Sequence, residues 1–224
     1  MHDTEGSEYD RLSYPFLFEG GKANIEDVLA QVRHSTREKC HEVIALRRAT
    51  FEHSAKRIVA AGEAMARAFA NGATLLAFGN GGSTTDAQDL VTELINPPFP
   101  AWSPLPAIAL TNDIAVITGV GNDVGIENIY ARQVIAFGQP GDIALGISTS
   151  GNSTNVLVAL EQAKKQGLLT VALAGYDGGK TMRSSAVDYC ILSPSDHIPR
   201  IQEAQATAYH ALIEVIHSLL RPTT

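Results

Sequence analysis

The sequence predicts an α/β domain in which a doubly wound parallel sheet is covered by helices on both faces. Three observations lead to this fold class: short apolar runs alternate with helical patterns after Gly72, each run is apolar throughout, and a long helical segment precedes them all. A strand that is apolar at every position is typical of a parallel sheet, because such a sheet is buried on both faces. Strands that alternate with helices favour a doubly wound arrangement.

Five apolar runs are the predicted strands, and they cover Thr74–Phe78, Ala107–Leu110, Ile143–Ile147, Thr170–Ala174 and Tyr189–Leu192. The helical patterns between and after them cover residues 82–95, 112–120, 125–137, 153–167 and 199–220. The proline-rich segment 96–106 joins a helix to the next strand and is too short for a domain linker. With 224 residues, one domain is the expected organisation.

Two consecutive helices are predicted before the first strand, between Asn24 and about Ala70, so that the sheet is preceded by a helical hairpin. Apolar side chains recur there at helical spacing, at Ile25, Val28, Leu29, Val32, Ile44, Leu46, Phe51, Ile58 and Val59. Residues 1–22 are mostly polar and acidic and are expected to form a flexible arm. Residues 23–224 then form a single domain that includes the N-terminal helices.

The charge balance argues against a nucleic-acid or membrane partner. The formal net charge is −7, and the 17 lysine and arginine residues are scattered rather than gathered in a stripe. No apolar run approaches the length of a membrane span. The two cysteines have no metal-type spacing and no signal peptide is visible, so a cytoplasmic protein is expected.

Two strand ends carry unusual turns. The first reads GNGGS at residues 79–83, and the second reads ISTSGNS at residues 147–153. Each lies where a helix begins, and a helix N-terminus offers free N–H groups and partial positive charge to an anion. A phosphate site is therefore predicted, and its candidate residues are Asn80, Gly81, Gly82, Ser83, Ser148, Thr149, Ser150 and Ser153.

Ordinary helix capping is the alternative interpretation, since serine and threonine are preferred at N-caps. Four hydroxyls within six residues, beside a second glycine-rich turn, exceed what capping requires. The first turn matches neither GxGxxG nor a Walker motif, which disfavours a nucleotide as the ligand.

Several motifs resemble one family. GNGGS (79–83), GND (121–123), GDIALGISTSGNS (141–153), GYDGG (175–179) and RIQE (200–203) resemble the sugar isomerase (SIS) domain, and more narrowly the bacterial phosphoheptose isomerases. Those enzymes interconvert sedoheptulose 7-phosphate and a manno-heptose 7-phosphate. The likeness covers about residues 24–220. It implies a three-layer flavodoxin-like sheet and a homotetramer whose active sites lie at subunit interfaces.

An aldose–ketose isomerisation moves a proton between neighbouring carbons through an enediol, and needs a base at carbon and an acid near the carbonyl oxygen. Glu93 lies one helical turn beyond Asp89, on the same face, and His210 lies on the last helix. The resemblance implies that Glu93 and His210 are the catalytic pair. Without it, a solvated glutamate and a core or surface histidine would be the ordinary interpretations.

The resemblance also implies a divalent metal, with zinc as the first expectation. The family binds zinc through a histidine, the catalytic pair and the glutamine of RIQE, which correspond here to Asp89, Glu93, Gln202 and His210. Asp89 thus replaces an imidazole, and the oxygen-rich set suits manganese or magnesium as well as zinc. Gln202 and His210 lie about 12 Å apart along a helix axis, so both reach one ion only with extended side chains or from neighbouring subunits.

Gln202 and Asp113 are further candidates for contact with the substrate. Asp113 follows a strand and would reach sugar hydroxyls, or alternatively would cap the next helix. Two other functions remain open beside the isomerase. One is a non-catalytic tetramer that acts as a scaffold for the bacterial replication initiator, and the other is a sugar-phosphate sensor that has lost turnover through the change at Asp89.

Overall fold

The computed structural model describes residues 25–220 of the chain. The chain forms two compact units, Met1–His41 and Glu42–Thr224. The expected boundary between a flexible arm and the domain, at residues 22 and 23, lies outside the described residues and stays a prediction.

The second unit is built on a parallel sheet, as predicted. Its strands are β1 (Leu75–Gly79), β2 (Ala107–Ala109), β3 (Ile143–Ser148), β4 (Leu169–Gly175) and β5 (Tyr189–Ser193). Their order is β2-β1-β3-β4-β5, and every neighbouring pair is parallel. This is the flavodoxin-like order. In it, Gly79 at the end of β1 is paired with Ile147 near the end of β3.

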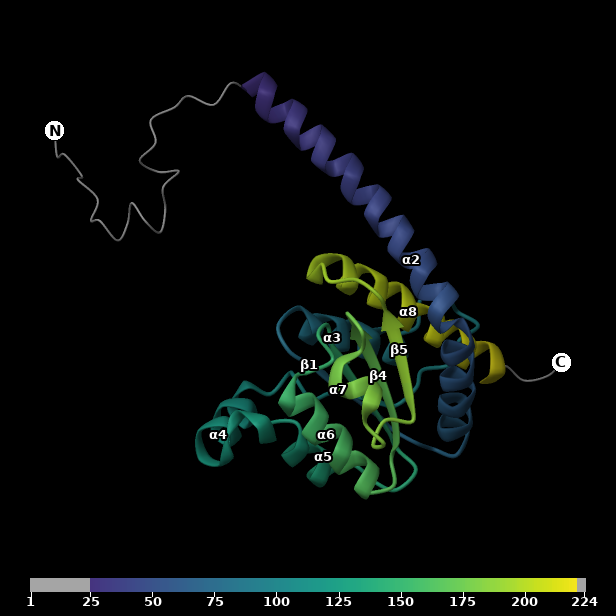
Figure 1. Cartoon of the computed structure of the whole chain (residues 1–224). Coiled ribbons are helices and arrows are strands. Elements are labelled where there is room, and N and C mark those ends of the chain that lie inside the picture. The colour runs from purple at the N-terminus through teal and green to yellow at the C-terminus, as the bar shows by residue number, and fades with distance from the viewer. Residues whose placement is uncertain (1–24, 221–224) are drawn as a thin grey trace, which may run out of the picture. The chain divides into compact units, whose positions relative to one another are not determined.

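Helices cover both faces of the sheet because successive strand residues point to opposite sides. In β1, Leu75 and Ala77 join one hydrophobic cluster, whereas Leu76 and Phe78 join the other. The first cluster contains side chains of α2 (Ile25–Ala70), α3 (Gly82–Ile95) and α8 (Ile198–Leu220). The second contains side chains of α5 (Ala131–Phe137) and α6 (Thr154–Lys165), and also Ile129 and Tyr130, which follow the short helix η2 (Ile126–Asn128). Figure 1 shows α3 and α8 on one side of the sheet and α5 and α6 on the other.

The predicted helical hairpin is wrong, because residues Ile25–Ala70 form one continuous helix, α2. The physical reason is visible in the sequence: this stretch holds no proline, and its single glycine is Gly62. In the first unit, Ile25, Val28, Leu29 and Val32 form an exposed apolar stripe at helical spacing. In the second unit the later turns of α2 carry buried side chains such as Ile58 and Met65.

The remaining helices differ from expectation only in detail. The predicted helix at 112–120 is α4 (Ile114–Val124), and it ends at Gly125, whose φ of 97° favours glycine. A short helix, α7 (Gly179–Arg183), follows β4 and was not predicted. None of the helices within residues 25–220 combines the length and the apolar character needed to cross a membrane.

Gly62 of α2 packs against Val215 of α8. A Cβ atom at this position would lie 2.5 Å from Cγ1 of Val215, and β-branched valine has little freedom to move away. We expect Gly62→Ala to lower the free energy of unfolding by about 1–2 kcal/mol, because overpacking outweighs the gain of about 1 kcal/mol in helix propensity. Denaturation by urea measures the change.

The matched control is Gly119→Ala in α4, where an added Cβ meets no atom within 4 Å. This variant is expected to be more stable than the unsubstituted protein by about 0.5–1 kcal/mol. Equal stability of the two alanine variants would contradict the close packing of α2 on α8.

Candidate active site

Helices α3 and α8 lie side by side and run in the same direction, which brings a row of polar side chains together. Gly82 at the start of α3 faces Gln202, Asp89 contacts Tyr209, and the next turn places Glu93 beside His210. Partner positions increase together along both helices, so the helices are parallel. The row thus runs along the rim of the α3–α8 contact.

Glu93 and His210 form a close pair in this row. Nε2 of His210 lies 3.0 Å from Oε1 of Glu93, and it lies 3.9 Å from Oδ2 of Asp89. Asp89, Glu93 and His210 each offer one ligand atom, and these atoms lie within 4.8 Å of one another. Two carboxylates and an imidazole at this spacing suit a divalent cation. The three side chains that were predicted to meet do so within one chain.

Gln202, the fourth predicted ligand, lies at the glycine turn. A Cβ atom at Gly82 would be 1.9 Å from Nε2 of Gln202, so a larger residue there would require the end of this side chain to move. Gly81 has a different role, because its φ of 57° places it in the left-handed region as the N-cap of α3. The glycines therefore serve both the backbone turn and the approach of α8.

The two predicted phosphate-binding segments are neighbours because β1 and β3 are paired. Asn80 and Asn155 tie them together through reciprocal amide hydrogen bonds of 2.8 and 2.9 Å. The hydroxyl of Tyr130 also donates to the carbonyl oxygen of Gly79 at 2.5 Å. The turn at residues 79–83 and the loop at 148–153 thus form one fixed surface at the carboxyl edge of the sheet.

Ser153 occupies the N-cap position of α6, but its side chain makes no capping hydrogen bond. Its hydroxyl lies 2.9 Å from the hydroxyl of Ser148 instead. Thr149 and Ser150 are half-buried beside them. Simple capping therefore does not account for Ser153, and the N-terminus of α6 keeps N–H groups available to an anion.

The comparisons with known proteins agree with this geometry. Residues 40–175 match the family model described as the SIS domain. The phosphoheptose isomerase of Solidesulfovibrio magneticus is 44% identical over 179 residues, which are 80% of this chain and 86% of that protein. The chain belongs to the SIS domain family.

Two solved structures are similar to the whole SIS domain. The phosphoheptose isomerase from Francisella tularensis aligns with a TM-score of 0.78 and 35% identity, and the alignment covers 84% of this chain and 98% of that one. The phosphoheptose isomerase from Neisseria gonorrhoeae aligns with a TM-score of 0.77 and 33% identity over 84% and 99%. Both similarities extend well beyond the glycine turn.

Two residues that were predicted to contact the substrate, Asp113 and Ser83, have other structural surroundings in the fold. Asp113 is the N-cap of α4, and its carboxylate accepts hydrogen bonds from the N–H groups of Ala115 and Val116 at 3.0 and 3.1 Å. The capping interpretation therefore describes the contacts that Asp113 makes. Ser83 is only 3% exposed. A substrate contact of either residue stays a prediction.

Tyr209 was missed by the sequence analysis. Its hydroxyl donates a hydrogen bond of 2.6 Å to Oδ2 of Asp89, and the residue is 2% exposed. Burial, and then the hydrogen bond to Asp89, raise the pKa of the Tyr209 phenol, so the hydroxyl keeps its proton at neutral pH. The available signal was spacing: Tyr209 follows Gln202 by seven residues and therefore lies on the same face of α8.

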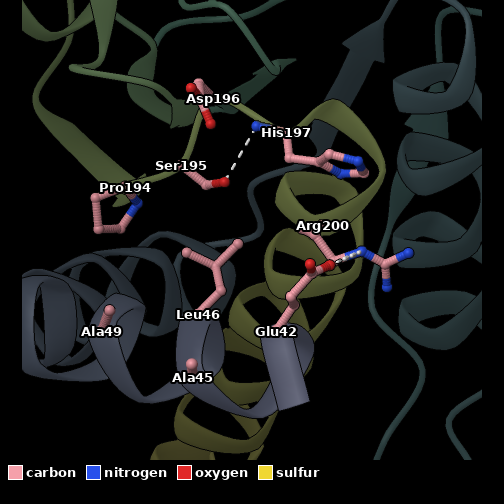
Figure 2. Close-up of a pocket in the computed structure, with 9 residues that line it drawn as sticks. All are labelled: Glu42, Ala45, Leu46, Ala49, Pro194, Ser195, Asp196, His197 and Arg200. Atoms are coloured by element: carbon pink, nitrogen blue, oxygen red, sulfur yellow. Dashed lines mark hydrogen bonds and ion pairs between the residues drawn. The ribbon is translucent and has the colours of Figure 1, made fainter. Parts of the chain in front are cut away.

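A pocket lies outside this row of residues, at the N-terminus of α8 (Figure 2). It has a volume of about 510 Å³, and its polar lining includes Glu42, Asp196 and His197. Arg200, the first residue of the RIQE motif, is held there by Glu203 at 2.5 Å and Glu42 at 3.6 Å. The arginine thus links α2 to α8 within the second unit, which is a structural role.

Asp86 was also missed, although it lies one turn before Asp89 on the same face of α3. Burial, and then the negative charge of Asp89, raise the pKa of Asp86 from 3.8 to about 6. Among residues 25–220 its buried Oδ2 has no hydrogen-bond partner. Asp86 therefore destabilises the folded state when it is ionised.

We expect Asp86→Asn to raise the free energy of unfolding at pH 7 in protein kept free of metal by a chelator. The folded state binds more protons than the unfolded state between pH 3.8 and about 6, so the stability of the unsubstituted protein falls as the pH rises through this window. The advantage of the variant should shrink below pH 4. Denaturation curves at pH 4 and pH 7 measure it.

Asp123→Asn is the control, since Asp123 is an exposed aspartate on α4. It should show no comparable gain at pH 7. A gain for Asp86→Asn of the same size at both pH values would contradict the raised pKa of Asp86.

Proposed function

We propose that this protein is a phosphoheptose isomerase, which interconverts sedoheptulose 7-phosphate and a manno-heptose 7-phosphate through an enediol. The observation that carries the proposal is the 3.0 Å contact between Glu93 and His210, in a chain that also has a hydroxyl-rich loop at the carboxyl edge of the sheet. The name that the relatives share supports the substrate.

The phosphate group of the substrate binds at residues 148–153 in this proposal. The hydroxyls of Ser148, Thr149, Ser150 and Ser153 supply neutral donors there, and the N-terminus of α6 adds backbone N–H groups. The amide pair of Asn80 and Asn155 holds this loop against the glycine turn. Gln202 lies at that turn and contacts the sugar.

The reactive end of the sugar lies between Glu93 and His210. One of these groups takes a proton from C1 of the ketose while the other supplies a proton to the carbonyl oxygen at C2, which gives the enediol. Return of a proton to C2 and loss of the proton on O1 then give the aldose. The proton count is unchanged over the reaction, so two groups that exchange protons with the sugar are sufficient.

A divalent cation belongs to the proposed site, and Asp89, Glu93 and His210 are its ligands. Gln202 lies at the glycine turn and would join them as a fourth ligand from a neighbouring subunit. The donor atoms of the first three residues supply two carboxylates and one imidazole within 4.8 Å, a set that suits zinc, manganese or magnesium. Such a cation would polarise the carbonyl oxygen of the bound sugar.

The working form in this proposal is a homotetramer with active sites at subunit interfaces. Two features support it: the apolar stripe at residues 25–32 of the first unit is exposed, and the side chains of Asp89 and His210 are 52% and 43% exposed. A cytoplasmic location is supported by Cys40 and Cys190, which are both free thiols.

Incorporation of solvent deuterium at C1 of the ketose and at C2 of the aldose tests the isomerase directly. With sedoheptulose 7-phosphate, the unsubstituted protein should incorporate deuterium, and Glu93→Gln and His210→Asn should each slow incorporation by about 100-fold or more, because each removes one proton-transfer group. Glu161→Gln, an exposed glutamate on α6, is the matched control and should exchange normally.

The outcomes separate the three functions. Sugar-phosphate binding without exchange would overturn the isomerase in favour of a sensor. If the protein neither binds the sugar phosphate nor incorporates deuterium, the non-catalytic scaffold is the remaining function. Exchange that survives both substitutions would remove Glu93 and His210 from the mechanism.

A further inference from the structure

Asp89 stands where the related isomerases are expected to have a histidine ligand, and its carboxylate needs a hydrogen-bond partner that holds it in one orientation. A carboxylate has two equivalent oxygens and turns about its terminal bond, so an exposed aspartate adopts many orientations. The Asp89 side chain is 52% exposed and lies on the rim of the α3–α8 contact. The carboxylate must therefore be held in one orientation if it is to serve as a ligand.

Tyr209 provides that hydrogen bond from the buried side. Its ring belongs to the same hydrophobic cluster as Leu90 and Leu94 of α3, and it packs against the ring of His210 at a centroid distance of 4.6 Å. The hydroxyl lies at the polar row and donates a hydrogen bond of 2.6 Å to Oδ2 of Asp89. A phenol has one proton to donate, and here that proton goes to Asp89.

We propose that Tyr209 is a positioning residue that orients the Asp89 carboxylate as a cation ligand. The inference rests on the cation site proposed above and adds a partner that acts through Asp89 rather than on the sugar. Because hydrogen-bond partners of metal ligands commonly contribute 10- to 100-fold to metal affinity, the strength of cation binding depends on this hydroxyl. The contact of Tyr209 with the His210 ring extends the same support to a second ligand.

Binding of Mn²⁺ alone tests the proposal without any enzymatic readout. Free Mn²⁺ has a strong electron paramagnetic resonance signal that is lost on binding, so titration of the apoprotein gives the dissociation constant. Tyr209→Phe keeps the ring and its packing and removes only the hydroxyl. We expect it to weaken Mn²⁺ binding by about 10- to 100-fold.

The matched control is Tyr189→Phe on β5, which makes the same chemical change at a half-buried tyrosine outside the row. It should bind Mn²⁺ like the unsubstituted protein. Asp89→Asn should also weaken binding, and adding Tyr209→Phe to it should have little further effect, because the hydroxyl acts through the carboxylate.

Unchanged Mn²⁺ binding by Tyr209→Phe, or independent losses in the double variant, would overturn the inference. The results distinguish failure of the Tyr209 inference from failure of the proposed isomerase activity. If the unsubstituted protein incorporates deuterium into the sugar but binds no Mn²⁺, the role of Tyr209 is lost while the isomerase stands. If Tyr209→Phe weakens Mn²⁺ binding in a protein that exchanges no proton, the positioning role stands and the isomerase is lost.

Discussion

The parallel packing of α3 against α8 is the constraint on which the candidate active site depends. Both helices place apolar side chains in one buried cluster, including Leu90 and Leu94 from α3 and Ala208 and Leu212 from α8. That burial fixes the axial position of each helix, since core side chains interlock and resist sliding. The hydrogen bond between Glu93 and His210 follows, because both side chains project from the rim of a contact that the core has already set.

The strand order supplies the second half of the site. In the order β2-β1-β3-β4-β5 the connections diverge between β1 and β3, and ligands of open α/β sheets bind at such a switch point. The glycine turn follows β1 and the hydroxyl-rich loop follows β3, so the two segments meet there. Two amide hydrogen bonds between Asn80 and Asn155 hold the glycine turn against the start of α6. A site for an anion at the loop thus lies at the carboxyl edge of the sheet, and Glu93 lies about three helical turns further along α3.

The sequence analysis recovered features that depend on local pattern and missed those that depend on contacts between distant segments. Strands that are apolar throughout, and turns rich in glycine and serine, are read directly from the chain. The hairpin failed because apolar spacing predicts helix without showing where one helix ends, and no proline interrupts α2. Tyr209 was missed because its hydroxyl acts on Asp89, and the parallel pairing of α3 with α8 is not visible in either segment alone. Asp86 was missed because its raised pKa comes first from burial in the folded chain and then from the charge of Asp89.

The central claim is that one substrate spans the hydroxyl-rich loop and the Glu93–His210 pair. A crystal structure of Glu93→Gln soaked with sedoheptulose 7-phosphate tests it most directly, because the variant keeps the shape of the side chain while removing its ability to take a proton. The account predicts phosphate density at residues 148–153, with C1 and C2 of the sugar about 3–4 Å from Gln at position 93 and from His210. Phosphate density elsewhere, or sugar carbons beyond reach of both side chains, would contradict it.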